Sequence, residues 1–145
     1  MHSRMLRISS SATIRRLFMW PARVENSTFL LGIYGHYPNL DNIEVTAIHI
    51  DAGARTLTLS FLSRNLPYKP PSNWEEFNKV LFQLQFFPIE SIDLSRFDYL
   101  GFSTLRMWDL GSFINVESKG AMDLCLQCVF VRINKLVGLL AGGSN

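Results

Sequence analysis

The chain has 145 residues, of which 48% are hydrophobic and 18% are charged. This composition is too apolar for a disordered chain, and the length suits one domain with a buried core. The formal charge is +2, but residues 1–24 contain five arginines and no acid, so the remaining nine basic and twelve acidic residues leave the rest at −3. A net acidic body argues against a nucleic-acid-binding face, which needs clustered lysine and arginine.

Residues 1–18 differ in composition from the rest and are interpreted as an extension outside the domain. They are rich in arginine and serine and lack acids, as organellar transit peptides do, but have no unbroken apolar run of the secretory kind. An upstream start codon explains them equally simply, with Met19 as the functional start, and we prefer that interpretation. Residues 19–145 are then a single domain, and no stretch has the roughly 18 apolar residues of a membrane span.

Short apolar patterns alternate with turn residues along this domain, which predicts one helix and several strands. A helix is expected over residues 28–34, because Asn26 or Ser27 can cap its start and Gly35 can end it. Strands are expected over residues 43–51, 56–63, 78–87, 102–110, 113–118 and 122–133. Pro88 is expected to end the third of these. Residues 89–94 are then a short strand or a turn of helix, of which we prefer the strand, and residues 136–140 are a last helical turn or a strand end.

Alternation within two of these strands predicts which side chains are buried. The inward-facing set is Leu57, Leu59, Phe61, Val80, Phe82, Leu84 and Phe86. Consecutive strands with short connections favour antiparallel pairing. The predicted fold is therefore α+β, a twisted and mainly antiparallel β-sheet with a short N-terminal helix.

The segment from Leu66 to Trp74 concentrates prolines and large rings. Pro67 and Pro70 have the spacing of a polyproline ligand. A packed corner is the preferred interpretation, because Tyr68 and Trp74 stand beside the prolines. We expect Trp74 to be mostly buried, so that its replacement by alanine costs about 3–5 kcal/mol.

No catalytic or metal-binding pattern stands out. Cys125 and Cys128 have the spacing of a zinc or redox motif, but they fall in a predicted strand, where residues three apart face opposite sides. The histidines, at positions 2, 36 and 49, are scattered, and neither a G-x-S-x-G elbow nor a P-loop is present. We expect no metal, no cofactor and no enzymatic activity, although a hydrolase site assembled from distant residues stays open.

Three segments resemble the bacterial immunity protein 50 family: NSTFLLGIYGHYPNLDNIEV (26–45), TLTLSF (56–61) and NLPYKPPSNWEEFNKVLFQLQFF (65–87). The resemblance covers residues 19 to about 94, and beyond 95 only the strand rhythm is similar. It implies a cytoplasmic protein, encoded beside a polymorphic or contact-dependent toxin, that binds the toxin and blocks it without turnover. The implied partner is a cognate protein toxin, such as a nuclease or another cationic domain, and neither nucleic acid nor a membrane.

The acidic excess suggests how such a partner would be contacted, because complementary charge raises association rate and specificity. The candidate partner-binding residues are the acids of the family-like half: Asp41, Glu44, Asp51, Glu75 and Glu76. An alternative function is a small binding module that uses the aromatic and proline corner as its recognition surface.

Removal of residues 1–18 is expected to leave stability unchanged, because these residues lie outside the predicted domain. The full chain and a chain that begins at Met19 are compared by thermal unfolding. A loss of more than about 2 kcal/mol, which is the scale of a core truncation, would contradict the prediction.

Overall fold

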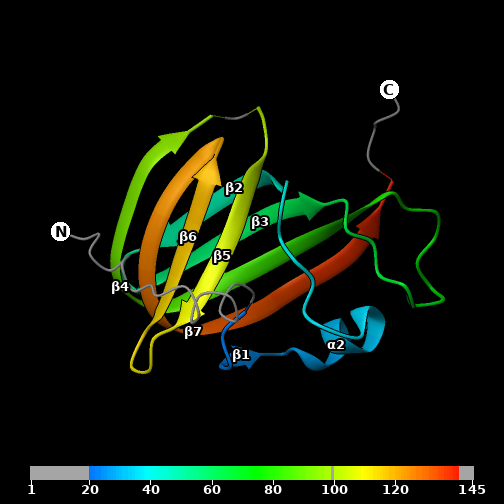
Figure 1. Cartoon of the computed structure of the whole chain (residues 1–145), viewed down its shortest axis with the longest axis horizontal. Helices are drawn as coiled ribbons and strands as arrows, with labels where there is room; N and C mark the ends of the chain where they lie inside the picture. Colours follow the sequence, from blue (N-terminus) through cyan, green and yellow to red (C-terminus); the bar gives the residue numbers. More distant parts are fainter. Residues whose placement is uncertain (1–19, 99, 141–145) are drawn as a thin grey trace, which may run out of the picture.

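A computed structural model describes residues 20–98 and 100–140, which form a curved, mainly antiparallel sheet and one short helix (Figure 1). Its elements in chain order are β1 (Val24–Glu25), α2 (Thr28–Tyr34), β2 (Glu44–Asp51), β3 (Thr56–Ser63), β4 (Lys79–Phe97), β5 (Ser103–Asp109), β6 (Ile114–Gly120) and β7 (Met122–Leu139). Among the described residues the order across the sheet is β2-β3-β4-β7-β6-β5, and β1 pairs in parallel with β7. The expected antiparallel sheet with an N-terminal helix is confirmed, although the helix is a minor part. No helix in these described ranges is long and apolar enough to cross a membrane.

The long strands β4 and β7 run side by side through the whole molecule and bend together (Figure 1). At one end of this pair, β3 lies along β4 and β2 lies along β3. At the other end, β6 lies along the first part of β7 and β5 lies along β6. The pair therefore belongs to two half-sheets, whose inner faces enclose the core.

The two half-sheets also meet at a second place, away from the β4–β7 pair. The backbone N–H of Ile43, just before β2, donates to the carbonyl of Ser103 at 2.8 Å, and the Ser103 N–H donates back at 2.9 Å. The N–H of Leu105 donates to the carbonyl of Leu40 at 3.0 Å. These bonds satisfy backbone groups of β5 that would otherwise lie unpaired at a sheet edge.

The core is the inner face that alternation predicted. Every residue of the expected inward-facing set is fully buried. The rings of Phe61 and Phe82, on neighbouring strands, stack with centroids 5.1 Å apart. Side chains from β5, β6 and β7 complete the core, including Met107, Ile114 and Leu126.

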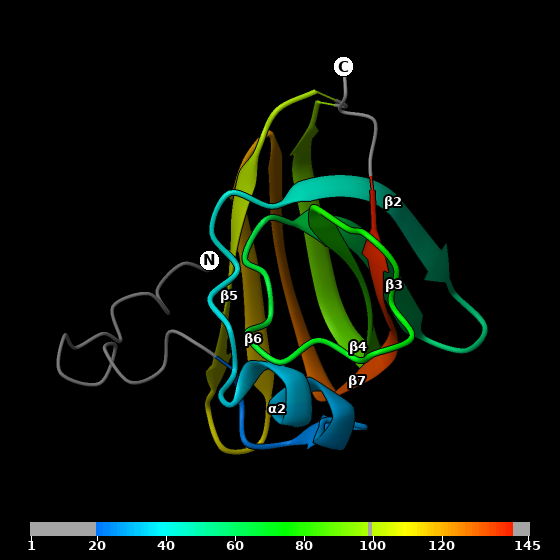
Figure 2. The same cartoon turned by 90° about the vertical axis from the view of Figure 1, so that its right-hand side faces the viewer.

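Helix α2 covers one end of this core (Figure 2). It has the predicted bounds, and Gly35 ends it with φ +81° while its N–H donates to the carbonyl of Leu31 at 2.8 Å. That conformation suits glycine, which lacks a Cβ. Leu30 and Tyr34 are buried, and the Tyr34 hydroxyl donates to the carbonyl of Asn65 at 2.6 Å.

The residues before α2 are tied to β5 and β7. The Arg23 guanidinium lies 3.0 Å from the Asp109 carboxylate, and β1 pairs with β7. Burial opposes ionisation of Asp109, but hydrogen bonds from Gly111 and Arg23 outweigh it and lower the pKa of this carboxyl below its usual value. The carboxylate therefore stays charged and holds the N-terminal segment against β5.

Two predictions about strand ends are wrong. Pro88 does not end a strand, because β4 continues to Phe97; the strand preferred over residues 89–94 is confirmed, but as part of β4. Proline lacks the N–H of a strand ladder, but β3 pairs with β4 only as far as Phe86, so Pro88 lies where β4 has lost that neighbour. Strand β7 likewise continues past the predicted end at residue 133 to Leu139, because β4 pairs with it along that length, so the strand-end alternative for residues 136–140 is confirmed.

The other expected elements are present with small shifts at their ends, in the strands that begin at Glu44, Lys79, Ser103 and Ile114. Such one- or two-residue differences are usual at strand termini. The prediction about residues 1–18 lies outside the described residues.

Gly120, the last residue of β6, offers a test of this packing. Its φ is +129°, and a Cβ there would meet the backbone carbonyl of Phe102. Gly111 is a matched control, with φ +93° and no described atom within 4 Å of its Cβ position. Gly120→Ala is expected to cost at least about 2 kcal/mol more than Gly111→Ala, since both carry the φ strain and only one the clash. Equal denaturant midpoints for the two variants would contradict this packing.

Candidate functional site

The two cysteines lie on opposite faces of β7, as the strand pattern predicted. Cys128 is buried in the core, and Cys125 is half-buried on the outer face. Burial raises the pKa of Cys128 to about 12, and burial with the nearby charges of Glu117 and Asp93 raises the pKa of Cys125. Both thiols are therefore protonated at neutral pH, whereas a reactive or metal-binding cysteine needs its thiolate.

The remaining candidates for chemistry do not converge within the described residues. His36 follows α2 and His49 lies on β2, and both are exposed. No group of three or more His, Cys, Asp or Glu side chains in residues 20–98 and 100–140 could hold a metal ion. The absence of a metal or cofactor stays a prediction.

The proline corner, from Leu66 to Trp74, packs beside α2. The N–H of Lys69 donates to the carbonyl of Ile33 at 3.1 Å, and the N–H of Trp74 donates to that of Pro71 at 3.1 Å. The first bond ties the corner to the helix, and the second closes a tight turn before β4. The corner is thus fixed by backbone bonds as well as by its prolines.

An aromatic cluster, made of Phe29, Trp74 and Phe77, lies over Gly138 on β7. Trp74 meets Phe77 edge-on with centroids 5.3 Å apart and Phe29 edge-on at 6.4 Å. A Cβ on Gly138 would lie 2.6 Å from Cε3 of Trp74 and 3.0 Å from Cγ of Phe77. The absence of a side chain at position 138 therefore provides the room for these rings.

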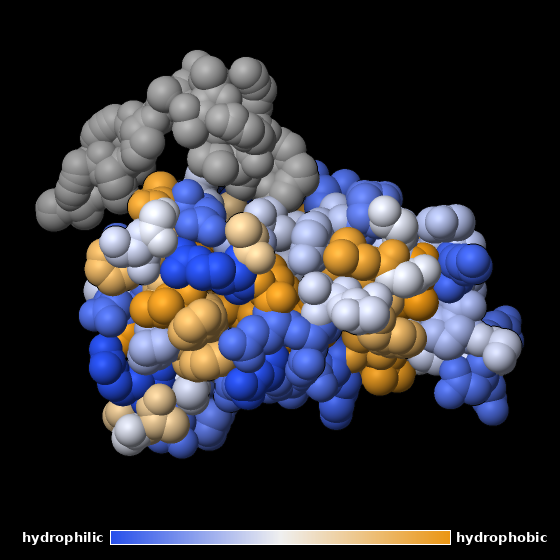
Figure 3. Space-filling view, turned by 90° about the horizontal axis from the view of Figure 1, so that it is seen from below, coloured by the Kyte–Doolittle hydropathy of each residue, from blue (hydrophilic) through white to orange (hydrophobic). Residues whose placement is uncertain are grey.

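The expectation that Trp74 is mostly buried holds only in part, because its side chain is half-buried. Other rings of this region are more open: Tyr68 is 74% exposed and Phe29 47% exposed. Figure 3 shows apolar side chains gathered in two areas of the lower face, one of them at the end of the molecule that carries α2. The corner thus contains a half-buried ring, Trp74, and a mostly exposed ring, Tyr68.

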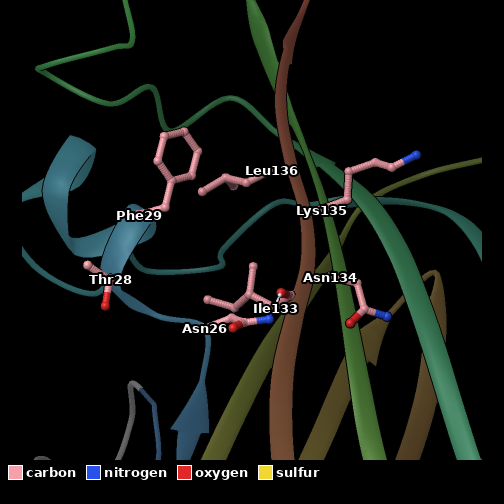
Figure 4. Close-up of a pocket in the computed structure, with 7 residues that line it drawn as sticks. All are labelled: Asn26, Thr28, Phe29, Ile133, Asn134, Lys135 and Leu136. Carbon is pink, nitrogen blue, oxygen red and sulfur yellow. Dashed lines mark hydrogen bonds between the residues drawn. The ribbon is translucent and has the colours of Figure 1, made fainter.

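A shallow cavity of about 350 Å³ lies between the start of α2 and β7 (Figure 4). Its apolar wall is formed by Phe29 and Leu136, which lie side by side in Figure 4. The Asn26 side chain donates to the carbonyl of Ile133 at 3.3 Å and closes the lower part. This cavity is more open than the enclosed, apolar pockets that hold small ligands.

The five acidic candidates are not gathered into one site. Asp41 precedes β2, 4.0 Å from the Arg106 guanidinium, while Asp51 ends β2 and accepts a hydrogen bond from the Ala54 N–H at 3.1 Å. A strand of eight residues separates these positions by roughly 25 Å.

Glu44 differs from the rest because it is half-buried and lies 3.4 Å from the ammonium of Lys79. Glu75 and Glu76 are exposed in the loop that leads to Lys79. The structure therefore places four exposed acids around the sheet margin, of which Asp41 faces Arg106, and a half-buried fifth acid, Glu44, in an ion pair with Lys79.

Sequence reasoning missed one apolar surface, on the second half of β4. Ile92, Leu94 and Phe97 are 38%, 40% and 45% exposed. The apolar alternation of Ile92 and Leu94 could have indicated this surface. It was not recognised as the edge of a long strand, because Pro88 was expected to end that strand.

The profile of the family described as Immunity protein 50 matches residues 26–137. This match runs from the residues before α2 almost to the end of β7 and covers more than half of the chain, so the chain belongs to the Immunity protein 50 family. It extends the resemblance beyond residue 94 to β5, β6 and β7. No curated protein and no solved structure gives a match.

Trp74→Ala is expected to cost about 2 kcal/mol, which is below the range for a fully buried ring because Trp74 is only half-buried. Tyr68→Ala should change the free energy of unfolding by less than about 0.5 kcal/mol, since that ring is mostly in solvent. Urea unfolding of both variants measures the two values. A Trp74→Ala variant as stable as the wild type would show that the corner does not hold the fold.

Proposed function

We propose that this chain is an immunity protein of the cytoplasm that binds a cognate protein toxin and blocks it without turnover. The observation that carries the proposal is the family match over residues 26–137. A toxin encoded in a polymorphic or contact-dependent system is the partner that the family implies. The unpaired state of Cys125 and Cys128 is compatible with a reducing compartment.

Inhibition of this kind depends on a complementary surface rather than on a reactive group. The residues from 25 onward carry three more acids than bases, which favours a cationic partner such as a nuclease domain. Charges at the rim of an interface mostly change the association rate and its salt dependence. Asp41, Asp51, Glu75 and Glu76 are exposed and suit this role.

Glu44 is the weakest of the five candidates, because its carboxylate already faces Lys79 at 3.4 Å. The Lys79 side chain is only 15% exposed, so reversing the charge at Glu44 would leave a poorly solvated cation beside a second one. Neutral amide variants therefore test the acidic residues without this added repulsion.

A second candidate function is a binding module for another ligand, centred on the corner. The observation in its favour is the exposed Tyr68 ring, which lies against Gly35 at the end of α2. Exposed tyrosines are frequent anchors in protein interfaces. Tyr68→Ala separates the two functions. A binding module centred on the corner should lose affinity for its ligand in this variant, whereas an immunity protein that contacts its toxin through acidic residues should keep its affinity for the toxin.

The direct experiment is co-purification of this protein with the toxin domain encoded beside it, at low and at high salt. We expect a stable complex at low salt and loss of toxin activity within it. Absence of a complex under both conditions would contradict the proposed function.

The acidic residues are tested by association rates measured against ionic strength. Three variants are compared with the wild type: Asp41→Asn with Glu44→Gln, Asp51→Asn alone, and Glu75→Gln with Glu76→Gln. A variant whose neutralised acids face the toxin should associate several-fold more slowly at low salt, and its association rate should depend less on salt than that of the wild type. Glu117→Gln, on β6 and outside the five, is the control. Wild-type rates in all three variants would remove the acidic residues from the interface while leaving the immunity function in place.

A further inference from the structure

One edge of the sheet is open along the second half of β4. Strand β3 pairs with β4 only from Val80 to Phe86, and Arg55 then covers Ile89 through its carbonyl and its guanidinium. From Ser91 to Phe97, β7 is the only described strand beside β4. Such an edge presents backbone N–H and C=O groups that can pair with another strand.

The inner face of this open edge is apolar. Ile92, Leu94 and Phe97 stand opposite Leu126, Leu124 and Met122 of β7. Opposite residues of an antiparallel pair share a face, and the three β7 residues are buried in the core. The three β4 residues therefore face inward yet remain between 38% and 45% exposed.

The exposure arises because only one end of the core is covered by the N-terminal part of the described chain. Leu30 and Tyr34 of α2 fill the end beside the proline corner and are almost fully buried. In Figure 1, α2 lies at the lower right, whereas the second half of β4 lies at the far left. No described element fills the left-hand end as α2 fills the other.

The charge along the edge is acidic. Residues 89–98 contain Glu90, Asp93 and Asp98 against the single base Arg96. Glu90 pairs with Arg55, and Arg96 lies between Asp98 at 3.6 Å and Asp123 at 3.8 Å. The carboxylate of Asp93 forms no ion pair or hydrogen bond within the described residues, although the Asp93 backbone belongs to the ladder with β7. A basic side chain of a partner beside the edge would compensate the negative charge of Asp93.

Two register shifts interrupt the edge, between Ile89 and Ser91 and between Leu94 and Arg96. Bulges and charges of this kind discourage indiscriminate pairing of edge strands. An acceptable partner therefore has to match the irregular ladder, the apolar inner face and the acidic charge together.

From these features we infer that the β4 edge from Ser91 to Phe97 binds an extended segment of the cognate toxin as an added strand. This inference rests on the proposed function and names its contact. Main-chain hydrogen bonds supply affinity in such strand addition, and alternate side chains supply specificity. The toxin segment carries apolar side chains that cover Leu94 and Phe97 and a lysine or arginine that faces Asp93.

Backbone hydrogen exchange of the full chain, with and without the purified toxin domain, tests the contact without any substitution. Amides from Ser91 to Phe97 should exchange more slowly in the complex, while those of β6, the strand that carries the control residue Glu117, should be unchanged. Unaltered exchange over residues 91–97 in a complex that forms would overturn the inference and leave the immunity function standing.

A matched pair of variants tests the apolar face. Leu94→Arg adds a charge at a residue 40% exposed on the edge, and Leu110→Arg adds it at a residue 43% exposed in the turn after β5. Toxin binding should weaken at least about thirtyfold for Leu94→Arg, the scale of an interface hot spot, and less than about threefold for Leu110→Arg. Thermal unfolding of both variants checks that they fold.

Asp93→Lys tests the charge. Binding should weaken by about tenfold or more at low salt, with a smaller loss at high salt because the interaction is electrostatic. Equal affinities for the wild type, Leu94→Arg and Asp93→Lys would overturn the inference. A dimer of the free chain that Leu94→Arg dissociates would also overturn it, because the edge would then belong to a second copy. Failure of the wild type to bind the toxin would instead contradict the proposed function, and the inference would fall with it.

Discussion

The structure depends on the continuous pairing of β4 with β7. These strands, Lys79–Phe97 and Met122–Leu139, form the longest ladder in the described chain. Because both strands bend, one ladder supports two half-sheets whose inner faces meet. The core is the space between those faces, and the stacked rings of Phe61 and Phe82 lie within it. Backbone hydrogen bonds hold the ladder, while burial of the alternate apolar side chains supplies the main driving force for folding.

This arrangement makes the two ends of the core different. One end is covered by α2, and the Arg23–Asp109 ion pair ties the segment before it to β5. The other end lies beside the second half of β4, where inward-facing apolar side chains remain partly in solvent. Helix α2 covers one end of the core, and within the described residues no element covers the other end in the same way. Function by binding requires an exposed surface and no reactive group.

The candidate surfaces differ in the interaction that each offers. The acids around the sheet margin act over distance and are weakened by salt, so they suit the approach of a cationic partner. The β4 edge offers apolar area and backbone groups, which act only on contact. The proline corner is divided, since Trp74 packs over Gly138 while Tyr68 is mostly exposed. A toxin inhibitor that uses charge for approach and an edge strand for retention would combine the first two.

The sequence by itself determined the helix Thr28–Tyr34, the strand Thr56–Ser63, the inward faces of β3 and β4 and membership of the immunity family. Those features follow from local chemistry: alternation decides which residues face the core, and Gly35 permits the left-handed end of the helix. Only the tertiary structure decided that β4 passes through Pro88, because that depends on where β3 ends and leaves the proline without a strand neighbour on one side. It also decided that Glu44 is paired with Lys79 and that residues 91–97 form an open edge. Pairing between strands distant in the chain determines such features, and no pattern within a single segment carries that information.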